Sequence, residues 1–192
     1  MNITLAFAFT LFFLVQFSCS SHPLNANSKS LNSPALTNEQ KGQNIRWEKQ
    51  GITFTVPLDW HKDESLSKDD VKQNDTFTNS GQLWRGPGDM SIEFNVESGD
   101  VDFPASESEM LEADYKTSKS NQVYKDTHYE EIDGTKGLYS RMDLDGERTK
   151  AYWLTYRHYK GKAQNVVAVV TGPKKDMDQL LTILKSTKLP HD

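Results

Sequence analysis

The residues of this chain that could build a metal site are a few histidines and carboxylates. His128 and His158 lie in separate predicted strands, and Glu130 could join them as an oxygen donor. Imidazole and carboxylate together are ligands that zinc and related metals accept. None of the five histidines stands in an H-E-x-x-H or H-x-H arrangement, and scattered strand histidines are usually surface or packing residues. We therefore predict that the protein holds no metal and no cofactor.

A second group of carboxylates occupies residues 143–147, with the sequence Asp-Leu-Asp-Gly-Glu. Alternating acidic residues followed by glycine are typical of calcium loops, in which the glycine is the sixth residue and a glutamate the twelfth. Here Gly146 is the fourth residue from Asp143, and Leu154 is the twelfth. We therefore predict a hairpin turn with solvated carboxylates and no tightly bound calcium.

The chain shows no arrangement of residues for covalent catalysis. It has no G-x-S-x-G motif, and Gly81, Gly86 and Gly88 are not followed by the Lys-Ser or Lys-Thr pair of a phosphate-binding loop. We predict no catalytic residue and favour a protein without enzymatic activity. The alternative is a small hydrolase or metal-dependent enzyme whose site is assembled from several strands, because motifs do not detect such sites.

Aromatic and basic side chains in the predicted strand 148–159 could instead bind a protein. Side chains alternate between the two faces of a strand, so Trp153, Arg157 and Tyr159 share one face. Tryptophan, arginine and tyrosine are enriched where protein interfaces contribute most of the binding energy. If this face of the sheet is open, the three residues are candidates for partner binding. If helices cover both faces, they are core residues.

The first residues of the chain have the features of an export signal. An apolar run extends from Ile3 to Phe17, and no charged residue precedes Lys29. We predict a signal peptide over residues 1–18. Because Gln16 interrupts the run, which is shorter than the roughly 20 residues that a membrane span needs, a permanent transmembrane anchor is the weaker interpretation.

The only cysteine of the chain, Cys19, directly follows this run. With the small residue Ser18 before it, the segment resembles the lipobox of bacterial lipoproteins, in which the cysteine is lipidated and becomes the first residue. The resemblance implies a lipid on Cys19 and attachment to a membrane. Ordinary signal cleavage before Ser21 is the alternative, and it would leave a secreted or periplasmic protein without a lipid. A single cysteine excludes an intrachain disulfide.

The composition indicates one folded domain preceded by a polar linker. Lys and Arg number 22 against 27 Asp and Glu, which gives a net charge of −5. We therefore predict no binding to nucleic acid, which favours basic proteins. Residues 19–44 are rich in serine and asparagine and lack aromatic residues, which predicts a flexible tether. The folded domain is predicted to span residues 45–192.

Apolar periodicity and turn residues predict an α+β domain. Alternating apolar residues indicate strands, glycine-containing pairs indicate the turns between them, and Ser106 with Glu109 has the spacing of a helix capping box. The predicted strands cover residues 52–56, 75–85, 90–97, 123–132, 135–143, 148–159 and 163–171, and the predicted helices cover 106–119 and 174–187. We interpret residues 61–75 as a solvated loop or a short helix. Val169 and Leu181 are expected to be buried.

Two segments of the sequence resemble a known superfamily. Residues 51–60, Gly-Ile-Thr-Phe-Thr-Val-Pro-Leu-Asp-Trp, resemble the first strand of the PsbP-like superfamily, and residues 180–190 resemble its last helix and terminal strand. The resemblance, which is best to the bacterial exported, DcrB-like branch, implies an α/β/α sandwich. Such a domain has a mostly antiparallel sheet of six to seven strands with helices on both faces. No functional residue can be carried over, because the matched positions serve packing and turns.

Proteins of that superfamily are chiefly binding or assembly modules. The resemblance and the export signal together favour a non-enzymatic lipoprotein of the bacterial cell envelope, with an unknown protein partner and a membrane contact through the lipid on Cys19. Besides an enzyme with a strand-built site, an immunity or chaperone-like protein that occupies one specific partner is an alternative.

Overall fold

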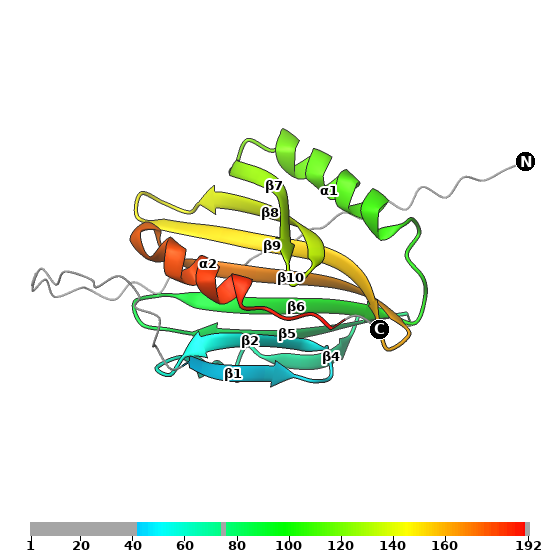
Figure 1. Cartoon of the computed structure of the whole chain (residues 1–192), viewed down its shortest axis with the longest axis horizontal. Coiled ribbons are helices and arrows are strands. Elements are labelled where there is room, and N and C mark those ends of the chain that lie inside the picture. Colours follow the sequence, from blue (N-terminus) through cyan, green and yellow to red (C-terminus); the bar gives the residue numbers. More distant parts are fainter. Residues whose placement is uncertain (1–41, 74–75, 191–192) are drawn as a thin grey trace, which may run out of the picture. The chain divides into compact units, whose positions relative to one another are not determined.

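The computed structural model describes residues 42–73 and 76–190, which Figure 1 shows in colour. The predicted signal peptide, Cys19 and the first part of the predicted tether lie outside the described residues. The elements are, in chain order, β1 (Gly42–Trp47), β2 (Ile52–Pro57), β3 (His61–Lys62), β4 (Lys68–Lys72), β5 (Phe77–Arg85), β6 (Ser91–Gly99), α1 (Glu107–Ser120), β7 (Tyr124–Ile132), β8 (Thr135–Asp143), β9 (Arg148–Tyr159), β10 (Lys162–Pro173), a 3-10 turn (Lys174–Asp176) and α2 (Met177–Lys185).

Eight of these strands form one sheet. Their order across it is β3, β5, β6, β10, β9, β8 and β7, with β4 also paired to β5, and β1 and β2 form a separate hairpin. The strands β7 to β10 follow one another as a meander. Two of its turns contain Asp133-Gly134 and Lys160-Gly161 in the left-handed conformation that tight hairpins require. Every strand pairing within the described residues is antiparallel, which confirms the predicted α+β fold.

The strands are more numerous than the predicted six or seven, and two regions account for the difference. Residues 61–75, expected to be a loop or a short helix, contain β3 and β4, which pair with β5. All residues of β4 are exposed, so the strand has no apolar alternation and is defined by its backbone pairing. In the other region, β1 begins at Gly42, before the predicted domain start at residue 45. Its pairing with β2 was not visible in the sequence pattern.

One face of the sheet, here called the α2 face, is covered by α2 and by the β1–β2 hairpin (Figure 1). Trp153 lies on this face, fully buried, and its Nε1 donates a hydrogen bond to the Glu130 carbonyl at 3.0 Å. Phe54 of the hairpin contacts Phe94 of β6 with ring centroids 4.6 Å apart. Leu180 of α2 is also fully buried. The α2 face is therefore a mainly apolar core.

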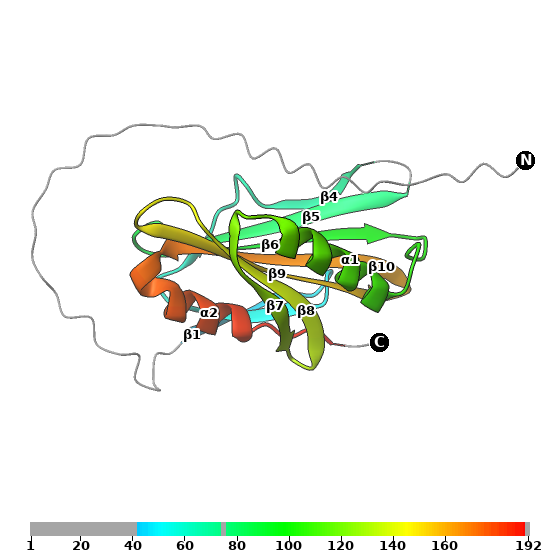
Figure 2. The same ribbon diagram turned by 90° about the horizontal axis from the view of Figure 1, so that it is seen from above.

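The opposite face, here called the α1 face, is covered by α1 over β7, β8 and β9 (Figure 2). The predicted capping box is present: Ser106 Oγ accepts from the Glu109 N–H, and the Ser106 N–H donates to the Glu109 carboxylate. Leu111 of the helix packs with Leu138 and Leu154 of the sheet. Both faces thus carry a helix, as the predicted sandwich requires.

Strand β10 lies inside the sheet, between β6 and β9, and its successive side chains point alternately to the two faces. Val169 on the α1 face is 9% exposed, and its neighbour Val170 on the α2 face is 0% exposed. Val169 is therefore buried, as expected. Leu181 is only partly buried at the edge of the α2-face core, because the buried side of α2 is centred on Leu180 and Leu184.

Candidate functional site

The residues predicted to bind a partner do not form an open surface. Trp153 is 0% exposed and Arg157 is 5% exposed, because α2 and the β1–β2 hairpin cover the face on which they lie. The prediction that these two side chains meet a partner directly is therefore wrong. Tyr159, at the end of the same strand, is half-buried and lines a groove.

Arg157 holds together the chain segments that form this groove. Its guanidinium donates to the carbonyl oxygens of Gln50 and Gly51, with the Gly51 contacts at 3.3 and 3.4 Å, and to the Pro190 carbonyl at 3.4 Å. Its Nε donates to Gln164 Oε1 at 3.0 Å. Without the guanidinium, these carbonyls would lose hydrogen bonds in a buried place, which is costly. Arg157 is thus a positioning residue for the groove.

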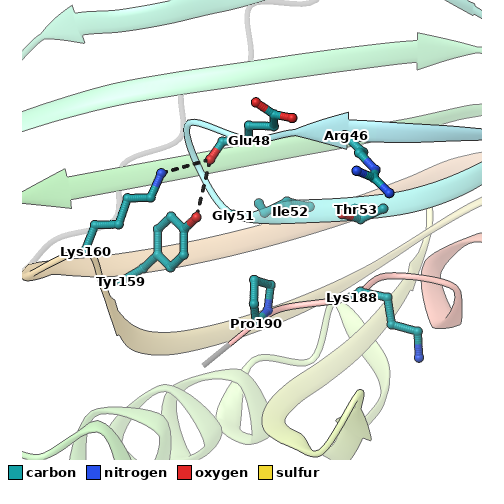
Figure 3. Close-up of a pocket in the computed structure, with 9 residues that line it drawn as sticks. All are labelled: Arg46, Glu48, Gly51, Ile52, Thr53, Tyr159, Lys160, Lys188 and Pro190. Carbon is teal, nitrogen blue, oxygen red and sulfur yellow. Dashed lines mark hydrogen bonds between the residues drawn. The ribbon is translucent and has the colours of Figure 1, made fainter. Parts of the chain in front are cut away.

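The groove has a volume of about 450 Å³, within the usual range for ligand sites. It is lined by nine residues: Arg46, Glu48, Gly51, Ile52, Thr53, Tyr159, Lys160, Lys188 and Pro190. Figure 3 shows that they come from the β1–β2 hairpin, from the turn between β9 and β10, and from the segment after α2. The groove is therefore a product of tertiary structure and not of one local motif.

Tyr159 forms one wall of the groove, and its place there depends on Gly51. The Tyr159 hydroxyl donates to the Glu48 carbonyl at 3.4 Å, and the ring centroid lies 4.9 Å from the guanidinium carbon of Arg157. Gly51 has a φ of +59°, and a Cβ at this position would overlap the Tyr159 ring. Any other residue here would be strained in its backbone and would displace the ring.

Three basic side chains give the groove its charge. Lys188 Nζ lies 2.9 Å from Asp133 Oδ1, so this cation forms an ion pair with a carboxylate. Within residues 42–73 and 76–190, neither Arg46 nor Lys160 has a carboxylate within ion-pair distance. Lys160 Nζ contacts the Glu48 carbonyl at 3.5 Å, while the Glu48 carboxylate points away from Lys160 (Figure 3). The groove therefore presents positive charge from Arg46 and Lys160.

These groups are suited to binding an anion. Tyr159 and Pro190 add apolar surface that a neighbouring side chain can contact. None of the nine described residues that line the groove is a serine, cysteine or histidine, the side chains that most often act as nucleophile or general base.

The two candidate metal-ligating histidines do not meet. His128 lies opposite Tyr139, which lies opposite Trp153, so His128 belongs to the α2 face. His158 is on the other face of β9, so the set of His128, His158 and Glu130 is not assembled. The described part of the chain contains no group of three or more His, Cys, Asp or Glu side chains that could hold a metal ion.

The carboxylates between β8 and β9 are engaged by the protein itself. Asp145 accepts hydrogen bonds from the backbone N–H groups of Glu147 and Arg148 at 2.9 and 2.7 Å, and from Arg148 Nε at 2.8 Å. The Arg148 side chain and these N–H groups lower the pKa of Asp145 to about 2. Asp143 pairs with Lys174 at 3.1 Å. These carboxylates stabilise the turn and the start of the segment leading to α2.

Further titratable groups lie under α1. Tyr156 donates to Asp114 Oδ2 at 2.6 Å. Burial raises the pKa of Asp114, which the Tyr156 hydrogen bond partly opposes, and burial also raises the pKa of Glu97. Asn165, paired across the strands with Tyr156 and Glu97, has a buried Oδ1 that meets no hydrogen-bond donor among the described residues. The α1 face thus has buried polar groups beside its small apolar cluster.

Sequence reasoning did not identify Arg46, Lys160 or Lys188. These residues are brought together by tertiary contacts, including the backbone bond from the Thr53 N–H to the Lys188 carbonyl at 3.1 Å. The Lys160-Gly161 pair was recognised as a turn signal, but nothing in the sequence connected that turn to β1. Only the three-dimensional arrangement reveals the basic cluster.

Comparisons with known proteins concern the fold. No protein-family model and no curated protein matches this sequence. LpqN of Mycobacterium tuberculosis, described as involved in cell envelope biogenesis, is 14% identical, with 78% of this chain and 91% of that chain covered and a TM-score of 0.51. Cyanobacterial PsbP (CyanoP) of Synechocystis sp. PCC 6803 is 14% identical, with 83% and 99% covered and a TM-score of 0.45. The Ran-binding protein Mog1p of Saccharomyces cerevisiae is 13% identical, with 80% and 97% covered and a TM-score of 0.39.

The domain therefore shares its fold with LpqN, and it has the α+β architecture with helices on both faces of an antiparallel sheet that the sequence resemblance implied. At identities this low, the likeness shows the fold alone and assigns no site. A separate finding concerns the membrane: over the ranges that the structure describes, no helix is both long and apolar enough to cross a bilayer.

Proposed function

We propose that this protein is a non-enzymatic binding module of the bacterial cell envelope and that its partner binds in the groove beside Tyr159. The observation that carries the proposal is the construction of the groove. The buried Arg157 guanidinium donates to carbonyls of the β1–β2 turn and of Pro190, two of the segments that line it. Burying an arginine is expensive unless its donors are well used. Here they are used to hold a basic depression in a fixed shape.

We further propose that the module is tethered to a membrane by a lipid on Cys19. The apolar run of residues 3–17, the single cysteine and the polar stretch after it support this proposal. Acyl chains contribute about 0.8 kcal/mol per buried methylene, so two chains suffice to hold the protein although the tether of residues 19–44 has few basic residues for electrostatic anchoring. LpqN, which has a similar fold, is described as involved in cell envelope biogenesis, and an envelope location for this chain agrees with that.

Photo-crosslinking in the native host, with the full chain, tests the partner site. A benzophenone amino acid replaces either Thr53, which lines the groove, or Thr55, which lies two positions along the same strand, is exposed and does not line it. We expect a discrete adduct with one protein from position 53 and none from position 55. Equal adducts from both positions, or no adduct from either, would show that the groove is not the partner site.

The same cells test the anchor. The protein and its adduct are expected in the membrane fraction and should move to the soluble fraction in the Cys19→Ala variant. Mass spectrometry of the amino-terminal peptide distinguishes a lipid on Cys19 from an uncleaved signal peptide. An unmodified amino terminus at Ser21 would refute the lipid anchor.

A further inference from the structure

On the basis of the groove's proposed role as the partner site, we infer what it binds: an extended acidic segment of a protein partner. The geometry points to carboxylates of that segment meeting Arg46 and Lys160, with an apolar side chain between them lying against Tyr159 and Pro190. The inference goes beyond the proposed function because it names the chemistry that selects the partner.

The charge of the groove is opposite to the charge of the chain. The whole chain carries −5, whereas three of the nine lining residues are basic and one is acidic. The overall negative charge disfavours approach by acidic surfaces in general, while the local positive patch favours one that docks there. Such a combination gives specificity, because an acidic partner gains attraction only when its carboxylates reach Arg46 and Lys160.

The backbone of the groove disfavours a compact inorganic anion. Phosphate sites commonly use several backbone N–H groups that converge on the ligand. Here the Gly51 N–H donates to the Glu48 carbonyl at 3.3 Å, and the Thr53 N–H donates to the Lys188 carbonyl at 3.1 Å. The remaining donors are charged ends of long side chains on separate segments. They fit carboxylates spaced along a peptide better than one small ion.

Lys160 occupies a backbone position that is unfavourable for lysine. Its φ of +52° lies in the left-handed region, where glycine, asparagine and aspartate are favoured and other residues cost free energy. The remaining non-glycine residues with positive φ in the described ranges are all aspartates: Asp70, Asp89 and Asp133. A lysine at this hairpin tip therefore lowers the stability of the fold. It also places a cation beside Tyr159, with Nζ 5.1 Å from the ring centroid.

A peptide titration with matched variants tests the inference. The probe is a fluorescent peptide of about ten residues that alternates glutamate with alanine, and its anisotropy is followed as the full chain is added in neutral detergent. Lys160→Asn removes the cation and keeps a residue that tolerates the left-handed conformation. Lys175→Asn, the control, removes an exposed lysine that does not line the groove.

We expect Lys160→Asn to weaken peptide binding about three- to five-fold, the size of one exposed ion pair, and Arg46→Gln to have a similar effect. Lys175→Asn should leave the affinity unchanged. The unfolding temperature of Lys160→Asn should equal or exceed that of the parent protein, which excludes misfolding as the cause. Equal losses in Lys160→Asn and Lys175→Asn, or no loss in either, would overturn the inference.

Four further arms define the ligand chemistry. The peptide with glutamine in place of glutamate should not bind, and added salt should weaken binding of the acidic peptide because exposed charges are screened. Displacement of the peptide by millimolar inorganic phosphate would reveal a small-anion site. Binding of phosphatidylglycerol vesicles that is lost in Lys160→Asn would reveal a lipid headgroup site. Either of the last two results would overturn the acidic-segment inference.

Crosslinking and titration can fail separately. An adduct from position 53 without binding of the acidic peptide would keep the groove as the partner site and refute only the acidic ligand. Binding of the peptide without any adduct in cells would support binding of acidic ligands by the groove and refute its proposed role as the site of a protein partner.

Discussion

The two faces of β9 show two ways to bury a sheet. On the α2 face, Trp153 is enclosed by aliphatic and aromatic side chains of α2 and the hairpin. On the α1 face, tyrosines reach the helix through their hydroxyls: Tyr152 bonds Ser118 at 3.2 Å, and Tyr156 bonds Asp114 at 2.6 Å. We expect packing on the α2 face to carry most of the stability. On the α1 face, hydroxyl bonds, one of them to the carboxylate of Asp114, add to the smaller apolar cluster that holds α1.

The groove lies where the apolar packing of the α2 face ends. Two positions after Thr155 the same face of β9 carries Arg157, and two positions later it carries Tyr159. The apolar core thus gives way to a buried cation that bonds backbone carbonyls and then to a half-exposed ring. A binding site placed at this end can use polar groups without interrupting the core around Trp153.

Truncating one large side chain on each face is expected to give the largest difference in stability between the two faces. Trp153→Ala should lower the free energy of unfolding by about 3–5 kcal/mol, because it leaves a large cavity in a packed core. Tyr152→Phe, its neighbour on the α1 face, removes only the hydroxyl that bonds Ser118 and should cost about 1 kcal/mol. Guanidinium unfolding followed by circular dichroism measures both. Similar losses would mean that the two faces contribute equally to the free energy of unfolding.

The next largest effect is expected at the end of the α2 face. Arg157→Lys keeps the positive charge but replaces a planar fork of donors with a single ammonium, which cannot reach Gln50, Gly51 and Pro190 together. We expect a loss of about 2–3 kcal/mol in the free energy of unfolding, the usual cost of disrupting buried bonds to a charged group. The crosslink from position 53 should also weaken. A loss below about 0.5 kcal/mol would show that Arg157 does not organise the groove.

The local features of the fold could be predicted because they are encoded over a few residues. The capping box at Ser106 and Glu109, the turns at 133–134 and 160–161, and the alternation within β8 and β9 each depend on neighbours in sequence. The strand β4 could not be predicted, because its residues are all exposed and its structure depends on pairing with β5.

The candidate site was beyond sequence reasoning for the same reason. For Arg157 the sequence left two interpretations open, a partner-binding residue on an open face or a core residue on a covered one, because alternation does not show which face is covered. The carbonyls that accept its hydrogen bonds belong to residues 50–51, more than a hundred positions away, and to Pro190. Tyr159 was among the candidate partner-binding residues of the sequence, but Arg46 and Lys188 carry no local signal that places them beside it.

A finer comparison uses two adjacent residues of β10. Val170, which faces α2, is 0% exposed, and Val169, which faces the α1 side, is 9% exposed. Each Val→Ala change removes two methyl groups at about 0.8 kcal/mol each, and a rigid surrounding adds a cavity cost. We expect about 2–3 kcal/mol for Val170→Ala and about 1.5 kcal/mol for Val169→Ala in chemical unfolding. A larger loss at Val169 would place the tighter packing under α1.

The smallest effects concern pH and distinguish the α1 face from the exposed turn before β9. Burial raises the pKa of Asp114 above its ordinary value of 3.8, so the folded protein binds this proton more tightly than the unfolded chain does. Stability from this group therefore falls as pH rises from about 3.8 through the raised pKa. Asp145 is the opposite case: the Arg148 side chain and backbone N–H groups hold its pKa at about 2, so its stabilising effect is present above 3.8 and is lost as pH falls toward 2.

The variants Asp114→Asn and Asp145→Asn test these two opposite pH dependences of the free energy of unfolding. Each removes one titration and keeps an oxygen that can accept a hydrogen bond, so the free energy of unfolding relative to the parent protein reports that group alone. As pH rises from 2 to 7, Asp114→Asn should become more stable relative to the parent, and Asp145→Asn should become less stable. Urea unfolding at a series of pH values gives both slopes, and the other titrating groups cancel in the difference. Slopes of the same sign would show that the folded protein stabilises the ionised form of Asp114 as it does that of Asp145, and burial would then not govern Asp114.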